Sequence, residues 1–218
     1  MEKQQIDFSV PLGTQQFFVE MQKNSIAPVA KLLSEFVSVY DRGDADLAFR
    51  EMIKLFVSVF KYSGLVTICD YLNVTKQDSF TDCNDVALID KFIYTNISGM
   101  SLGHWQWCLR EITRWAREKE IKLFVPGMID LYWKRNGKPA DVALWIDNKM
   151  IPLRNDFVHS DIWIDKETSR KLICEYLPSL AGYMNTMSFI NAYPLKTDDQ
   201  KSFYILDGSG NRLDLNYL

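Results

Sequence analysis

Apolar side chains recur at intervals of three and four residues along most of the chain, which is the period of an amphipathic helix. The pattern predicts helices over about 28–40, 45–62, 86–97, 102–119, 127–133, 142–159 and 166–191. Segment 45–62 is apolar on nearly every side, which predicts a central position. Gly64 is expected to interrupt this helix, with residues 65–72 continuing as a short helix or as an extension of it, and the polar stretch 76–84 is expected to form a loop.

Pro152 lies inside the helical pattern of residues 142–159. Proline lacks the backbone N–H that a helix interior needs, yet it is well suited to a first helical turn. Two arrangements therefore fit the sequence. Either the helix kinks at Pro152, or one helix ends near Lys149 and another begins at Pro152.

The pattern of apolar residues after about residue 194 is no longer that of a helix. Residues 202–206 and 212–217 are strand-like and flank the turn-forming sequence Asp207–Asn211, which predicts a β-hairpin. A lone hairpin is marginal in water, so it must pack on the helices, pair with another chain or begin a further domain. The predicted fold is all-α, an up-and-down bundle of about five or six helices with a small C-terminal β-hairpin. We expect a lead-in over 1–24, the bundle over 25–193 and the hairpin over 194–218.

Composition narrows the classes of function. A net charge of −3 over 218 residues gives no global positive field to attract nucleic acid, so polyanion binding would need a local patch. The four cysteines show no Cys-x-x-Cys pair, which argues against a zinc site and predicts no metal. The N-terminus is polar and no apolar run approaches the roughly 20 residues of a membrane span. We expect a cytoplasmic protein with reduced cysteines, without a cofactor or a membrane segment.

Three arginines, Arg110, Arg114 and Arg117, share one face of the helix predicted over 102–119. They could form a patch for backbone phosphates. Glutamates are interleaved with them, so an ion-paired, solvated face is the alternative. His104, at the start of the same helix, is more typical of a neutral, hydrogen-bonded residue than of a catalytic one. With Cys108 it could touch a metal, but no further ligand stands nearby.

The segment Arg154-Asn155-Asp156-Phe157-Val158-His159 holds one of only two histidines in the chain. Histidine titrates near neutral pH and can take or give a proton, and arginine presents a forked donor to phosphate oxygens. Asn155 could hydrogen-bond a phosphate or orient the histidine. These groups suit cleavage of RNA without a metal. Positions five apart on a regular helix do not share a face, so a kink or helix end near the motif would help the two side chains converge.

This motif resembles the signature of the HEPN family (higher eukaryotes and prokaryotes nucleotide-binding), in which an arginine precedes a histidine by four to six residues and a polar residue often follows the arginine. The flanking helices, and the upstream segment Ser101–Trp105 running into Leu109-Arg110, look similar as well. The resemblance covers about residues 25–193. It implies a homodimer whose two motifs meet in a cleft, and an endoribonuclease of a bacterial defence or toxin system. The reaction would be 2′-hydroxyl transesterification giving a 2′,3′-cyclic phosphate.

Other observations favour a silent domain. Asp156, Asp161 and Asp165 would repel RNA unless they point away, Arg154 could pair with Asp156 or Asp161, and His159 could cap a helix C-terminus. The alternative function is therefore a catalytically silent HEPN-like dimerisation or sensor module of a larger protein, with a protein partner or a fused domain.

Overall fold

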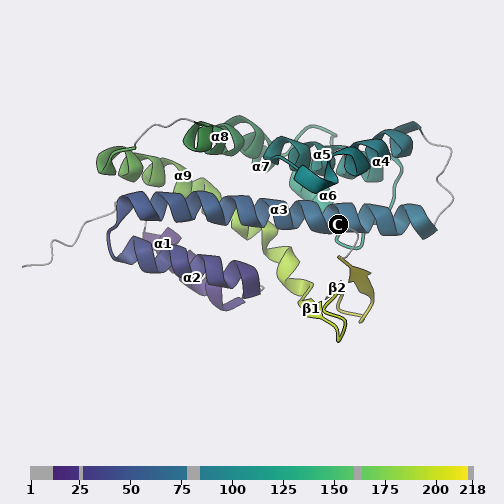
Figure 1. The fold of residues 1–218 in the computed structure, drawn as a ribbon, viewed down its shortest axis with the longest axis horizontal. Coiled ribbons are helices and arrows are strands. Elements are labelled where there is room, and N and C mark those ends of the chain that lie inside the picture. Colours follow the sequence, from purple (N-terminus) through teal and green to yellow (C-terminus); the bar gives the residue numbers. More distant parts are fainter. Residues whose placement is uncertain (1–11, 25–26, 78–83, 160–163, 216–218) are drawn as a thin grey trace, which may run out of the picture. The chain divides into compact units, whose positions relative to one another are not determined.

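The computed structural model describes residues 12–24, 27–77, 84–159 and 164–215. The chain divides into two compact units, one formed by residues 1–59 and 156–191 and the other by residues 60–155 and 192–218. The elements labelled in Figure 1 include α1 (Leu12–Asn24), α2 (Ala27–Asp41), α3 (Ala45–Gln77), α4 (Asn84–Asn96), α5 (Leu102–Glu118), α6 (Gly127–Tyr132), α7 (Asp141–Trp145), α8 (Ile151–His159) and α9 (Lys166–Thr186). The predicted all-α class with C-terminal β structure is confirmed.

The first unit contains α1, α2, the beginning of α3, the end of α8 and α9. Helices α1 and α2 are neighbours (Figure 1), and Phe18 of α1 meets Phe36 of α2 edge to face with 5.5 Å between ring centroids. The turn after α2 ends at Asp44, whose carboxylate accepts a hydrogen bond from the backbone N–H of Leu47 at 3.2 Å. This N-cap fixes the start of α3.

The second unit contains the remainder of α3, helices α4 to α7, the beginning of α8 and the strands. Aromatic pairs join its helices. Tyr71 of α3 meets Trp115 of α5 edge to face, and Phe92 of α4 stacks on Trp107 of α5 with 3.8 Å between ring centroids. The stripe predicted for residues 102–119 is the buried face of α5, which begins at a capping box formed by Ser101 and His104.

Helix α3 runs unbroken through Gly64, so the predicted interruption is wrong. The reason is the close approach of α5. A Cβ atom at position 64 would lie closest to Cε3 of Trp105, and 3.1 Å from its Cζ3. Glycine therefore suits position 64 because a larger residue would clash with Trp105, and not because the helix ends there. By length and composition α3 could cross a membrane, but 67% of its most apolar window is buried in the structure, as in the core helix of a soluble protein.

Gly64→Ala is therefore expected to destabilise the protein by about 1–2 kcal/mol, because overpacking against the indole outweighs the gain in helix propensity. Gly182→Ala in α9 is the matched control, since nothing lies within 4 Å of the added Cβ there. The control is expected to be stabilising by about 0.5–1 kcal/mol. Urea unfolding of both variants measures the difference. Equal effects of the two substitutions would show that Trp105 does not constrain position 64.

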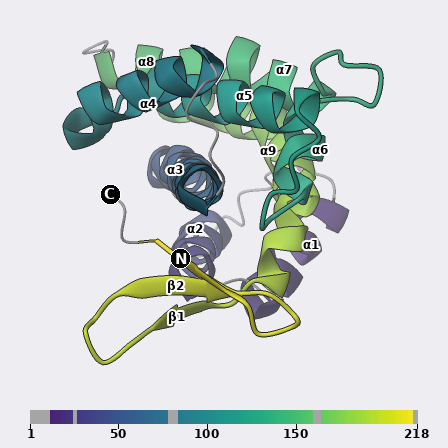
Figure 2. The ribbon, with the colours of Figure 1, turned by 90° about the vertical axis from the view of Figure 1, so that its right-hand side faces the viewer.

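The C-terminal strands form a three-stranded antiparallel sheet of order β1-β2-β3, comprising β1 (Leu195–Thr197), β2 (Phe203–Leu206) and β3 (Arg212–Asp214). Figure 2 shows β1 and β2 side by side. The predicted hairpin is the β2–β3 pair, and its turn is held by Asp207, which accepts hydrogen bonds from the backbone N–H groups of Ser209 and Asn211. Strand β1 adds a third member that the sequence pattern did not predict.

Candidate active site on helix α8

Helices α7 and α8 are joined by a π-helical turn, η3 (Ile146–Met150). The N–H of Ile151 donates to the carbonyl of Ile146, which is the five-residue spacing of a π-helix. Pro152, which has no N–H to donate, is the second residue of α8 and so lies in its first turn. Neither predicted arrangement is found as stated: helical backbone is continuous from α7 through η3 into α8, so no helix ends near Lys149 and none begins at Pro152, and the irregularity before the proline is the π-helical turn.

The π-helical turn lies before both motif residues, so it does not change the spacing between them. Arg154 and His159 belong to the same regular α-helix, where positions five apart are separated by about 140° around the axis. The kink expected to help them converge therefore does not do so within one chain. Positions 154 and 159 therefore lie on different sides of α8.

Arg154 and Asn155 are brought together. Nη1 of Arg154 donates a hydrogen bond to Oδ1 of Asn155 at 3.1 Å, and both side chains are half-buried. No carboxylate of a described residue lies within 4.0 Å of this guanidinium, so Arg154 does not pair with Asp156. Asp161, the other expected partner, lies outside the described residues. Among the described residues, the guanidinium is thus oriented by a neutral acceptor and meets no carboxylate.

His159 is the last residue of α8, and its side chain lies outside the described residues. Two residues earlier, Phe157 contacts α3. Its ring meets Phe49 edge to face at 5.2 Å, and the guanidinium of Arg50 lies 5.3 Å from its centroid. Helical spacing puts position 159 about 200° from position 157. The backbone at His159 is therefore on the side of α8 opposite the contact with α3.

The acidic residues near the motif are only partly described. Asp156 is exposed, and Asp165 caps α9 by accepting hydrogen bonds from the backbone N–H and the hydroxyl of Thr168, at 2.9 and 3.1 Å. These hydrogen bonds lower the pKa of Asp165. Its negative charge is thus engaged in holding the start of a helix.

The arginines of α5 do not form a free phosphate patch. Arg114 pairs with Glu111, Arg110 lies 4.0 Å from Asp147 of the π-helical turn, and Arg117 lies 4.0 Å from Glu118. The ion-paired face, which was the alternative, is what the structure has. His104 is also engaged locally, since its Nδ1 accepts a hydrogen bond from the backbone N–H of Ser101 at 3.3 Å.

Metal and thiol chemistry have little support in the part of the chain that the structure describes. No cluster of three histidine, cysteine or acidic side chains able to hold a metal occurs there. Cys69 and Cys108 are buried and Cys174 is half-buried, while Cys83 lies outside the described residues. Burial raises the pKa of the Cys108 thiol to about 12, which keeps it protonated at neutral pH.

The structure also contains a buried polar face of α3, formed by Ser63, Thr67 and Asp70. These residues follow one another at spacings of four and three, so they share one side of the helix. The sequence interpretation overlooked them, although three polar residues at this spacing inside an apolar run are a readable signal. The Asp70 carboxylate accepts hydrogen bonds from the backbone N–H groups of Phe124 and Val125, which fastens the segment between α5 and α6 to α3.

One oxygen of Asp70, Oδ1, has no hydrogen-bond partner among the described residues, and neither has the hydroxyl of Thr67. Burial raises the pKa of Asp70 to about 6, against the lowering effect of the two backbone donors. Nearby, Phe124 packs on Tyr193, whose pKa is raised by burial and by the charges of Asp207 and Asp70. We interpret this carboxyl group as a structural tie whose protonation affects stability.

Comparisons of the chain with protein-family models, with curated proteins and with solved structures give no match. The chemistry of α8 therefore carries the functional proposal by itself.

Proposed function

We propose that this protein is a metal-independent endoribonuclease of the HEPN type that acts in the cytoplasm in a bacterial defence or toxin role. The observation that carries the proposal is the state of Arg154. Its guanidinium is half-buried, is oriented by Asn155 and has no described carboxylate within 4.0 Å. An arginine held in this way offers a forked set of donors to a phosphate.

Arg114 and Arg212 differ from Arg154 in this respect. Arg114 is neutralised by Glu111, and Arg212 by Asp198 at 2.9 Å and Asp214 at 2.6 Å. A phosphate would have to displace these carboxylates before it could bind. At Arg154 it would meet a neutral amide instead, and the Asn155 side-chain N–H groups could donate to the same anion.

The proposed reaction is an internal transesterification of RNA. The ribose 2′-oxygen forms a bond to the adjacent phosphorus while the bond from phosphorus to the 5′-oxygen breaks. The 2′-hydroxyl loses a proton and the departing 5′-oxygen gains one; His159 makes one of these two transfers and water makes the other. Arg154 stabilises the charge that builds on the phosphate oxygens. The products are a 2′,3′-cyclic phosphate and a 5′-hydroxyl.

The proposed active unit is a homodimer. Because Arg154 and His159 lie about 140° apart on one helix, the proton-transfer group and the phosphate-binding group come together when two copies of α8 face each other. A two-fold axis would create two equivalent sites, each with Arg154 and Asn155 from one chain and His159 from the other. Helical spacing puts Asn155 and His159 within about 20° of the side opposite Phe157 and Arg154 about 60° from Phe157, so the second chain would bind over the flank of α8 between Arg154 and His159.

The test is incubation of the purified chain with a panel of RNAs in excess EDTA, with the fragment ends identified by mass spectrometry. We expect cleavage that persists in EDTA and leaves 2′,3′-cyclic phosphates. Fragments that carry 5′-phosphates, or cleavage that EDTA abolishes, would contradict the proposed mechanism. If no RNA of the panel is cleaved, the catalytically silent dimerisation or sensor module becomes the better description.

A further inference from the structure

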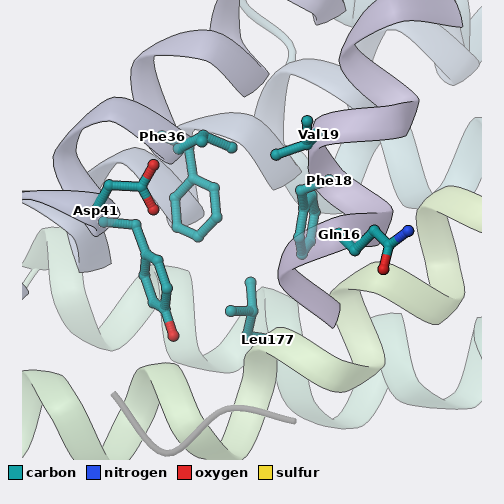
Figure 3. A pocket seen from close by; sticks show the side chains of 8 residues that line it. Gln16, Phe18, Val19, Phe36, Asp41 and Leu177 are labelled. Carbon is teal, nitrogen blue, oxygen red and sulfur yellow. The ribbon is translucent and has the colours of Figure 1, made fainter. Parts of the chain in front are cut away.

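The first unit contains a cavity of about 460 Å³ that the proposed nuclease does not use. It is bounded by α1, α2 and α9, and its size is within the range of small-molecule sites. Figure 3 shows Phe18, Val19, Phe36 and Leu177 around it, with Asp41 on one side and Gln16 on the opposite side. The walls are therefore apolar and aromatic, and a carboxylate lies at one end.

Three features of this cavity favour a positive charge. The faces of Phe18, Phe36 and Tyr40 carry the negative part of the aromatic quadrupole. Asp41 supplies a carboxylate from the last residue of α2. The C-terminal end of a helix is also the negative end of its dipole, and α2 ends at this cavity.

No positively charged side chain is present among the described residues that line the cavity. Arg42, next in sequence to Asp41, lines a different cavity together with Glu35 and Glu51. The positive side chain nearest in sequence to Asp41 thus lines a different cavity. Asp41 is exposed and its charge is solvated, so a cation in the cavity would gain an ion pair that a neutral guest cannot make, and an anion would be repelled.

We propose that this cavity binds a small organic cation of the arylalkyl- or alkylammonium class. The apolar body of the ligand lies against Phe18, Phe36 and Leu177, and its ammonium group lies near Asp41. The site is independent of the proposed nuclease, because it involves neither Arg154 nor His159.

The test uses 2-phenylethylammonium as the probe and 2-phenylethanol as its uncharged counterpart of similar size. Both are titrated into the full chain labelled at the methyl groups of valine and leucine. We expect the methyl signals of Val19, Val37 and Leu177 to shift with the ammonium probe, while that of Val158, which is exposed and outside the cavity, stays in place. The alcohol is expected to bind at least about fivefold more weakly, since it lacks the charge.

Two variants locate the interaction. Asp41→Asn is expected to weaken binding of the ammonium probe by at least about fivefold, whereas Glu175→Gln, which removes an equally exposed charge outside the cavity, leaves it unchanged. Val19→Trp, at a 41% exposed position of the lining, is expected to block both probes by filling the space. Equal binding of amine and alcohol, equal effects of Asp41→Asn and Glu175→Gln, unaffected binding to Val19→Trp or no methyl shifts at all would each overturn the proposal.

Discussion

His159→Ala is expected to slow RNA cleavage by at least about 100-fold, because a positioned acid or base contributes roughly 10²–10⁴ to the rate of such a reaction. Arg154→Ala is expected to cause a loss of at least about 100-fold as well, since it removes a donor aimed at the developing charge. Arg154→Lys keeps the charge but loses the forked geometry, so we expect an activity between those of wild type and Arg154→Ala.

The controls for these variants lie on the same helical segment. Val158→Ala truncates an exposed neighbour of His159, and Lys149→Ala removes an exposed positive charge from the π-helical turn. Both are expected to retain cleavage within about twofold, because surface substitutions away from a site have small effects. Single-turnover rates with saturating RNA, with circular dichroism to confirm folding, give the comparison. Activity that survives His159→Ala and Arg154→Ala would place the nuclease site elsewhere.

The second large effect concerns the buried Asp70. Its pKa in the folded protein is about 6, above the ordinary value of 3.8, so the folded state holds the proton more tightly than the unfolded state between these two values. The contribution of Asp70 to the unfolding free energy is therefore greatest at low pH. This contribution is lost as the pH rises through 6. The two-unit difference corresponds to about 3 kcal/mol of unfolding free energy.

Asp70→Asn is expected to remove this pH dependence of the unfolding free energy. Its side-chain carbonyl can still accept from the N–H groups of Phe124 and Val125, while no charge remains to be buried. Urea unfolding between pH 4 and 7.5 should show the free energy of wild type falling by about 3 kcal/mol relative to the variant as the pH rises. Asp130→Asn, at an exposed position of α6, should follow the wild type. A constant difference between wild type and Asp70→Asn across this range would contradict the role of the buried charge.

Local periodicity was sufficient to predict most helices, because each amphipathic pattern is contained in its own segment. It failed where the local structure is determined by a contact with a residue distant in sequence. Gly64 indicates a break when read alone, but the structure places Trp105 against it, and this contact joins residues 41 positions apart. Strand β1 has three residues, too few for a period of two to show. Its pairing with β2 is made by residues six to ten positions away.

The candidate site was predicted in part. The motif itself can be read from the sequence, and the hydrogen bond between Arg154 and Asn155 follows from their adjacency. The π-helical turn could not be predicted, since Pro152 alone is compatible with a kink or a new helix start. Asp70 was overlooked because a single acid in an amphipathic helix is usually exposed, and its burial depends on the backbone N–H of Val125, 55 residues later.

The most direct test of a site shared by two chains is to mix the Arg154→Ala and His159→Ala proteins after unfolding and refolding them together. The first variant still supplies His159 and the second still supplies Arg154, so a mixed dimer contains one complete site. Random pairing gives half mixed dimers with one intact site of two, and we expect the mixture to regain about a quarter of wild-type cleavage. If each variant is inactive alone and the mixture is inactive too, while wild type cleaves RNA, Arg154 and His159 do not act together across a dimer.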